Sequence, residues 1–124
     1  MDTKILEEIG LTQSEIKVYL TLNKLGSARA AEIIEKSGLQ SPVVHRAFHS
    51  LADKGLITSI EIGKIKEYQS VKPERLVNII EERKEKLLNI IPELKQQNEI
   101  AKKRPEARIY KGIKAIRVEN QRSL

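Results

Sequence analysis

The sequence predicts a mainly helical fold with one small β-hairpin and a long helix towards its end. Apolar residues recur with the period of a helix over most of residues 1–54 and again over residues 73–103. Residues 56–71 change to the alternating period of a strand. With 3% aromatic residues, no tryptophan and no cysteine, the core has to be aliphatic, which suits packed helices.

The first two helices are defined by their ends. Residues 2–10 have apolar side chains at helical spacing and end at a glycine, which predicts a short first helix. Thr12 and Glu15 have the spacing of a capping box, in which each side chain binds the backbone N–H of the other residue. A second helix is therefore expected to begin there and to end at Gly26, which suits a C-cap.

A third helix over residues 28–37 and a fourth over residues 42–54 are expected next. Ser41 is the expected N-cap of the fourth helix. Pro42 is expected at its first position, where a missing N–H costs nothing because it would have no partner inside the helix. Gly55 ends this helix, whose inward positions are Val44, Ala47, Phe48 and Leu51.

Residues 56–61 and 65–71 predict two antiparallel strands joined by a short turn at Gly63 and Lys64. Helices followed by a hairpin in this order are typical of a winged helix-turn-helix, whose recognition helix enters the major groove of DNA. Residues 42–54 would be that helix, and we expect the module to occupy residues 1–72.

The last helix is expected over residues 73–104, with a bend but no end at Pro92. Its apolar positions have the spacing of a short coiled coil: Leu76, Ile80, Leu87, Ile90, Ile91, Leu94 and Ala101. A helix of about 45 Å is too long for the winged module to cover. We therefore expect a second copy to cover this row, in a dimer whose helices are parallel or antiparallel.

The formal net charge of +6 lies in one place. Residues 1–71 have nine basic and nine acidic side chains, whereas residues 102–124 have eight basic and two acidic side chains. Residues 105–124 are thus a basic tail in which residues 107–110 resemble a single strand. We expect this tail to be a solvated surface or the remnant of a further domain. Any DNA binding by the winged module has to depend on a few placed cations.

Several classes of function are excluded at this stage. Without cysteine there is no disulfide, no cysteine-bound metal and no thiol nucleophile. The sequence shows no glycine-rich phosphate loop, no acidic metal cluster and no serine with a suitable base, so we expect no enzyme and no cofactor. It also has neither a long apolar run nor a signal peptide, which predicts a cytoplasmic protein without membrane contact.

The candidate DNA contacts lie on the outer face of residues 42–54, at the start of that helix and on the hairpin. They are Gln40, Ser41, Pro42, Val43, His45, Arg46, His49, Ser50, Lys64 and Lys66. Arg46 is the first choice because a guanidinium can bind the O6 and N7 atoms of guanine together. Gln40 and Ser41 would lie where free N–H groups attract phosphate.

Each of these residues also has an ordinary structural interpretation. Arg46 is alternatively a solvated arginine in a surface ion pair, and Lys64 and Lys66 alternatively keep the hairpin soluble. His45 and His49 are one helical turn apart, but no third ligand is evident, so we expect no metal. Tyr19, Phe48 and Tyr68 fall on inward stripes and are expected in the core.

Several short motifs, in this order and spacing, resemble the TrmB-like archaeal transcriptional regulators. They are Gly10-Leu11-Thr12, Tyr19-Leu20, Gly26-Ser27-Ala28, Ser50-Leu51, Lys54-Gly55-Leu56-Ile57, Ile90-Ile91-Pro92-Glu93-Leu94 and Tyr110-Lys111-Gly112-Ile113. The resemblance covers residues 5–116. It implies a winged helix-turn-helix, a linker helix and the opening of a C-terminal domain, which binds the ligand in sugar-responsive members. Because the chain ends soon after that opening, sugar sensing and a small-molecule effector are not implied.

The functional prediction is a dimeric, sequence-specific regulator that binds double-stranded DNA and acts by occupying a promoter. The alternative is a winged-helix module that binds another protein and no DNA, which the neutral charge of residues 1–71 favours. A third hypothesis is a fragment whose sensor lies on another chain. The salt dependence of DNA binding separates the first two.

Overall fold

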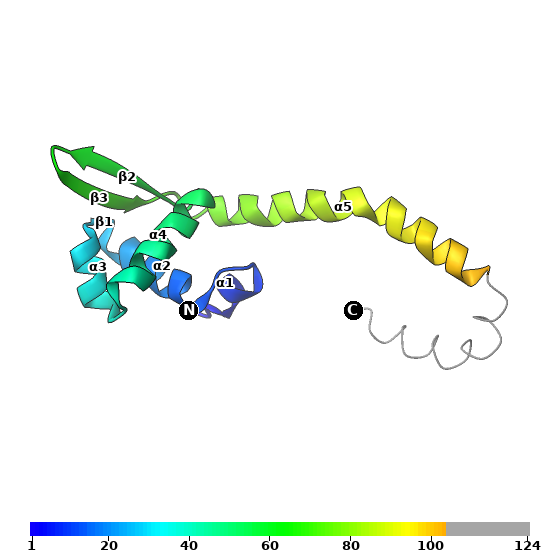
Figure 1. Cartoon of the computed structure of the whole chain (residues 1–124), viewed down its shortest axis with the longest axis horizontal. Helices are drawn as coiled ribbons and strands as arrows, with labels where there is room; N and C mark the ends of the chain where they lie inside the picture. Colours follow the sequence, from blue (N-terminus) through cyan, green and yellow to red (C-terminus); the bar gives the residue numbers. More distant parts are fainter. Residues whose placement is uncertain (104–124) are drawn as a thin grey trace. The chain divides into compact units, whose positions relative to one another are not determined.

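The computed structural model describes residues 1–103 and divides the chain into two units, Met1–Glu82 and Arg83–Leu124. The first unit holds four helices and a small sheet, and a fifth helix begins in it (Figure 1). The elements are α1 Lys4–Glu8, α2 Gln13–Leu25, β1 Ser27–Ala28, α3 Ala30–Ser37, α4 Ser41–Asp53, β2 Ile57–Ile62, β3 Ile65–Ser70 and α5 Arg75–Lys102. The predicted fold class, mainly helical with a β-hairpin and a long last helix, is confirmed.

The expected ends of α2 are confirmed. The Thr12 hydroxyl accepts a hydrogen bond from the Glu15 backbone N–H at 3.2 Å, and the Glu15 carboxylate accepts one from the Thr12 N–H at 2.8 Å. This is a complete capping box. At the other end, Gly26 has φ +82° and donates its N–H to the Leu22 carbonyl at 2.8 Å.

The predicted start of α4 is wrong by one residue. Gln40 is the N-cap, because it is extended (φ −76°, ψ 153°) and its carbonyl accepts the N–H of Val44 at 3.0 Å. Ser41 and Pro42 therefore both lie in the first turn. No side chain caps this end of the helix.

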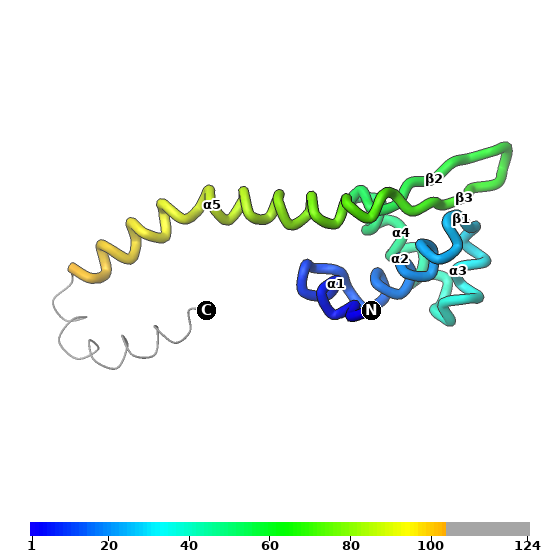
Figure 2. Tube along the Cα trace, turned by 180° about the vertical axis from the view of Figure 1, so that it is seen from behind, coloured from blue at the N-terminus to red at the C-terminus, as the bar shows by residue number. Residues whose placement is uncertain are grey.

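The predicted third helix begins too early, because residues 27 and 28 form a strand. β1 pairs with β3 in an antiparallel sheet of order β1-β3-β2, with Ala28 opposite Tyr68. The tube in Figure 2 shows β1 beside β3. Arg29 is still extended, so α3 starts at Ala30. The reason is tertiary: the outer edge of β3 offers backbone hydrogen bonds that this short segment can satisfy.

The predicted hairpin is confirmed. β2 and β3 pair with Ile62 opposite Ile65, so that Gly63 and Lys64 form the two-residue turn. The core of the first unit lies between the helices and this sheet. It is aliphatic, as expected, apart from Tyr19, Phe48 and the partly buried Tyr68. Its side chains with less than 2% exposure are Leu22, Ile33, Leu51, Leu56, Val18 and Val44.

A close approach fixes the connection from α4 to the start of α5. Gly55 has φ +77°, and a Cβ there would lie 2.8 Å from Nε of Arg75, so only glycine fits without displacing that side chain. The same Nε donates a hydrogen bond to the Lys54 carbonyl at 3.3 Å. The first turns of α5 also pack on the core through Ile79, which is 6% exposed.

Pro92 lies inside α5, as predicted, and the helix continues to Lys102. Figure 1 shows the axis of α5 change direction in the yellow part of the helix, as is expected for a helix that contains a proline. The predicted strand at residues 107–110 and the basic tail at residues 105–124 lie outside the described residues.

Candidate nucleic-acid interface

The exposed face of α4 presents the side chains that were predicted to read DNA. Pro42, His45, Arg46 and His49 are exposed, whereas Val44, Phe48 and Leu51 on the other side of the helix are buried. Within residues 1–103 the Arg46 side chain makes no hydrogen bond or ion pair. Its guanidinium is therefore available to an outside partner.

The start of α4 has the properties of an anion site. Gln40 and Ser41 are exposed and Val43 is half-buried. Because no side chain caps this end, the N–H groups of the first turn are open to an outside acceptor. The positive end of the helix dipole points the same way.

The hairpin, called the wing below (residues 57–70), is held against α4 by stacked aromatic rings. Tyr68 of β3 stacks on Phe48 of α4 with ring centroids 3.8 Å apart and an angle of 15°. Lys66 is two residues before Tyr68 and so lies on the same face of the strand. Its ammonium is 5.6 Å from the Tyr68 ring centroid, a cation–π distance.

A pocket of about 230 Å³ lies between α4 and the wing, and we call it the helix–wing pocket. It is lined by His45, Phe48, His49, Ala52, Ser59, Lys66 and Tyr68. Three of these residues were predicted as DNA contacts, namely His45, His49 and Lys66. The structure thus brings them together, while Lys64 stays separate at the exposed turn.

Sequence reasoning missed Ser59 as a part of this surface. Ser59 lies directly opposite Tyr68 in the strand register and therefore on the face that looks at α4. The signal was available only indirectly: pairing across the Gly63–Lys64 turn fixes the register, and Tyr68 marks the inward face.

Ser50 differs from the other predicted contacts, because its hydroxyl lies in an internal network. It accepts a hydrogen bond from Nζ of Lys54 at 2.9 Å, and the same ammonium donates to the Glu15 carboxylate at 3.0 Å. Glu15 is 5% exposed. This network joins the end of α4 to the start of α2.

The environment of Glu15 favours its charged form. Burial alone would raise the pKa of the Glu15 carboxyl. Hydrogen bonds from Ser50, from the Thr12 backbone and from Lys54, together with the Lys54 charge, outweigh burial and hold that pKa below its usual value. The native state therefore binds this proton less readily than the unfolded chain, and the ion pair stabilises the fold above the ordinary carboxyl pKa.

Replacing Glu15 with glutamine is expected to lower the free energy of unfolding by about 1 to 2 kcal/mol at neutral pH, because a charge-assisted hydrogen bond is lost. As the pH falls below the ordinary carboxyl value of 4.5, the wild-type chain loses this stabilisation and the two proteins converge. Urea unfolding followed by circular dichroism at several pH values measures the difference. Glu35→Gln, an exposed carboxylate on α3, is the control. A difference that stays constant across pH would contradict the assignment.

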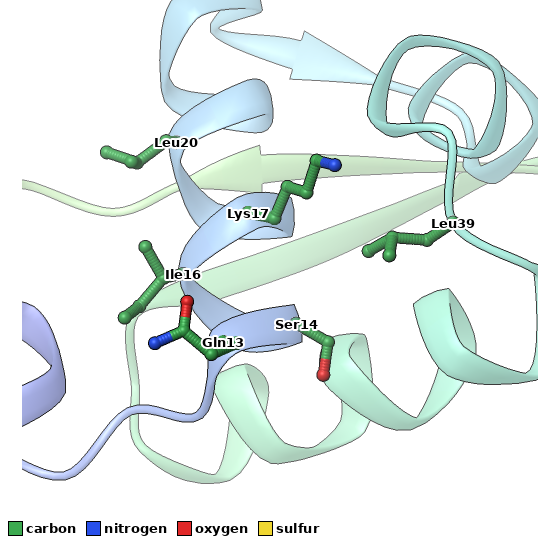
Figure 3. Close-up of a pocket in the computed structure, with 6 residues that line it drawn as sticks. All are labelled: Gln13, Ser14, Ile16, Lys17, Leu20 and Leu39. Carbon is green, nitrogen blue, oxygen red and sulfur yellow. The ribbon is translucent and has the colours of Figure 1, made fainter.

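A larger hollow of about 580 Å³ lies along α2, and no residue of α4 or the wing lines it. In Figure 3, Gln13, Ile16 and Leu20 lie on the left of α2, whereas Ser14, Lys17 and Leu39 lie on the right. Its polar groups therefore do not converge on one point, as a catalytic or ligand site would require.

The described residues give no sign of a metal or membrane site. Across residues 1–103, no group of three or more His, Asp or Glu side chains is placed to hold a metal ion. In the same part of the chain, no helix combines the length and the apolar character that crossing a bilayer requires.

The predicted dimer contacts on α5 are mostly exposed in the single chain. Ile80, Leu87, Ile90 and Leu94 have 46 to 55% of their surface exposed. Ala101 is also exposed, Ile91 is half-buried, and Leu76 packs partly against the core of its own chain. Further exposed apolar side chains on this helix are Val77, Leu88 and Ile100.

Comparison with known proteins identifies relatives of the winged part. The model of the family described as "Sugar-specific transcriptional regulator TrmB" matches residues 6–74. Over 77 residues the chain is 35% identical to the HTH-type sugar sensing transcriptional regulator TrmBL1 of Pyrococcus furiosus. This match covers 62% of the chain but only 22% of that relative, so the chain spans about a fifth of its length.

Solved structures show the same fold. TrmBL2, an archaeal chromatin protein whose structure is described as showing a novel mode of DNA binding, superposes with a TM-score of 0.68. Its sequence is 24% identical, and the match covers 78% of this chain and 37% of TrmBL2. A possible transcriptional regulator from Methanosarcina mazei superposes with a TM-score of 0.60 at 13% identity, covering 75% and 83% of the two chains.

Proposed function

Because the chain belongs to the TrmB family of transcriptional regulators, we propose that it binds double-stranded DNA sequence-specifically, as a dimer, and regulates transcription by occupying a promoter. The observation that carries this proposal is the exposed face of α4, where Arg46 is free of partners among the described residues. The description of TrmBL2 as a DNA-binding protein supports it.

α4 would lie in the major groove with its first half at the base edges. The Arg46 guanidinium would bind guanine, and its fork geometry gives the base specificity that a lysine lacks. Gln40 and Ser41 would place the open N–H groups of the first turn against a phosphate. Lys64 at the turn of the wing would reach the backbone beside the site.

α5 would join two copies. Ile80, Leu87, Ile90 and Leu94 form a row of large apolar side chains, each with about half of its surface in water, and burial of that half contributes roughly 0.8 to 1.5 kcal/mol for each. An identical row on a second chain is a matching partner, because a two-fold dimer uses the same surface from both copies. Two copies of α4 then read two half-sites of one duplex.

Affinity for a duplex is expected to fall steeply with salt, because Lys and Arg contacts to phosphate release condensed counterions. With roughly six to ten phosphates contacted by a dimer, the loss between about 50 and 200 mM salt is about 10³- to 10⁵-fold. Fluorescence anisotropy with a duplex selected by the wild-type chain from a random library measures this dependence. An affinity that is indifferent to salt would instead favour the apolar, protein-binding alternative.

A further inference from the structure

The helix–wing pocket combines hydrogen-bond donors with an apolar floor. Lys66, Ser59 and His45 supply an ammonium, a hydroxyl and a ring N–H. The half-buried Tyr68 supplies aromatic surface beneath them, and the buried Phe48 supports the Tyr68 ring from below. An anionic group next to a small apolar ring system matches this distribution, and a phosphate attached to a deoxyribose has that chemistry.

The donors are held in place before any ligand binds. The Lys66 ammonium lies over the ring of Tyr68, which stacks on the buried Phe48. The His45 ring contacts Phe48 edge-on, with centroids 6.1 Å apart and an angle of 80°. A site whose donors are already ordered loses less side-chain entropy when it binds.

A duplex bound as proposed above places one backbone strand at this pocket. With α4 in the major groove and the wing at the neighbouring minor groove, the sugar-phosphate strand that separates the two grooves has to pass between them. We propose that the helix–wing pocket holds one phosphate of that strand together with its deoxyribose. This inference rests on the proposed function and adds the ligand of a defined pocket to it.

In this site the Lys66 ammonium and the Ser59 hydroxyl donate to the phosphate oxygens, and the deoxyribose lies against the half-buried Tyr68 ring. His45 donates a further hydrogen bond from the α4 side. Two carboxylates lie nearby: Asp53 is 3.6 Å from Nε2 of His49, and Glu61 is the cross-strand neighbour of Lys66. Neither of them lines the pocket.

Neutralising single phosphates tests the site directly. Wild-type chain and Lys66→Met are titrated with the selected duplex and with versions that carry one neutral methylphosphonate per half-site, moved along the backbone. We expect one position at which the methylphosphonate weakens wild-type binding by about tenfold for each half-site, the size expected for a charge-assisted hydrogen bond. Lys66→Met should bind the unmodified duplex about tenfold more weakly for each half-site and should lose much less than the wild-type chain at that position.

Lys64→Met is the matched control, because Lys64 is on the same wing but outside the pocket. The loss of affinity caused by Lys64→Met and the loss caused by the same methylphosphonate should multiply, because the two changes remove independent contacts. Ser59→Ala, a second variant that removes only a hydroxyl, should lose less affinity than Lys66→Met and should still be weakened by the same methylphosphonate, because the Lys66 ammonium remains paired with that phosphate. If the loss of affinity caused by Lys66→Met multiplies with the loss caused by the methylphosphonate at every position, Lys66 contacts none of these phosphates and the proposal is overturned.

The phosphate could belong to the DNA backbone or to a free phosphorylated molecule, because both have the same chemistry. A titration with sodium phosphate in the absence of DNA distinguishes these two sources. We expect no saturable shift of the His45 and His49 ring protons in NMR spectra at millimolar phosphate. A saturable shift would assign the pocket to a free phosphorylated molecule and overturn its assignment to the duplex. Failure of the proposed function itself is distinguishable, because the wild-type chain would then bind no unmodified duplex at any salt.

Discussion

Replacing both Leu87 and Leu94 with lysine is expected to convert the dimer into monomers and to reduce affinity for the operator by at least about 100-fold. The two residues are seven positions apart, and about half of each side chain is exposed in the single chain. Burying the exposed half of four such side chains per dimer represents roughly 3 to 6 kcal/mol. A micromolar to nanomolar dimer is held together by about 8 to 12 kcal/mol, so losing this burial and placing four like charges in the interface is sufficient to separate the chains at micromolar concentration.

The affinity for the operator falls because a monomer has only one DNA-binding module. Linking two binding modules raises overall affinity by about 10²- to 10⁴-fold without any new contact to DNA. Lysine is a good helix former, so α5 itself should persist, and circular dichroism can verify this. The control is Asn89→Lys with Gln96→Lys, a pair with the same spacing on the opposite face of α5. A double Leu variant that remains dimeric in light scattering would exclude this row as the interface.

Arg46→Ala is the second change with a large expected effect. Loss of a bidentate contact to guanine costs about 1 to 3 kcal/mol per half-site, which corresponds to roughly 5- to 160-fold in affinity for each protomer. Arg46→Lys should not restore specificity, because an ammonium cannot form the two parallel hydrogen bonds. The melting temperature should be unchanged, since within residues 1–103 the Arg46 side chain stabilises no neighbour by a hydrogen bond or ion pair.

The contact is verified on the DNA side with 7-deazaguanine, which lacks the N7 acceptor. When it replaces the guanine that Arg46 contacts, it should weaken DNA binding by the wild-type chain and leave DNA binding by Arg46→Ala unchanged. Competition binding against operator variants gives the ratio of specific to non-specific affinity, which we expect to fall in Arg46→Ala. If Arg46→Ala binds the operator as tightly as the wild-type chain does, Arg46 does not contact the bases.

Much of the fold was predictable because its signals are local. The capping box at Thr12 and Glu15 needs only residues three apart, and Pro42 and Gly55 mark the two ends of α4 within one helix. The Gly63–Lys64 turn sets the register of the wing. β1 carried no such signal, because two residues do not form a strand alone and only the edge of β3 makes them one.

The candidate site was predictable in outline only. Helical spacing placed Arg46 and the two histidines on the exposed face of α4, as the structure has them. The partner of the Ser50 hydroxyl could not be read from the sequence, because the network depends on Glu15, which lies 39 residues from Lys54 along the chain. The helix–wing pocket likewise arises from residues that meet only when the wing packs on α4.

The number of chains on one operator duplex tests the central proposal most directly. Native mass spectrometry of the wild-type chain with the selected duplex, at low salt and micromolar protein, measures it in one experiment. We expect two chains on each duplex, with free protein present as dimers. A chain that stays monomeric and binds no duplex under these conditions would contradict both the proposed dimer and the proposed DNA binding.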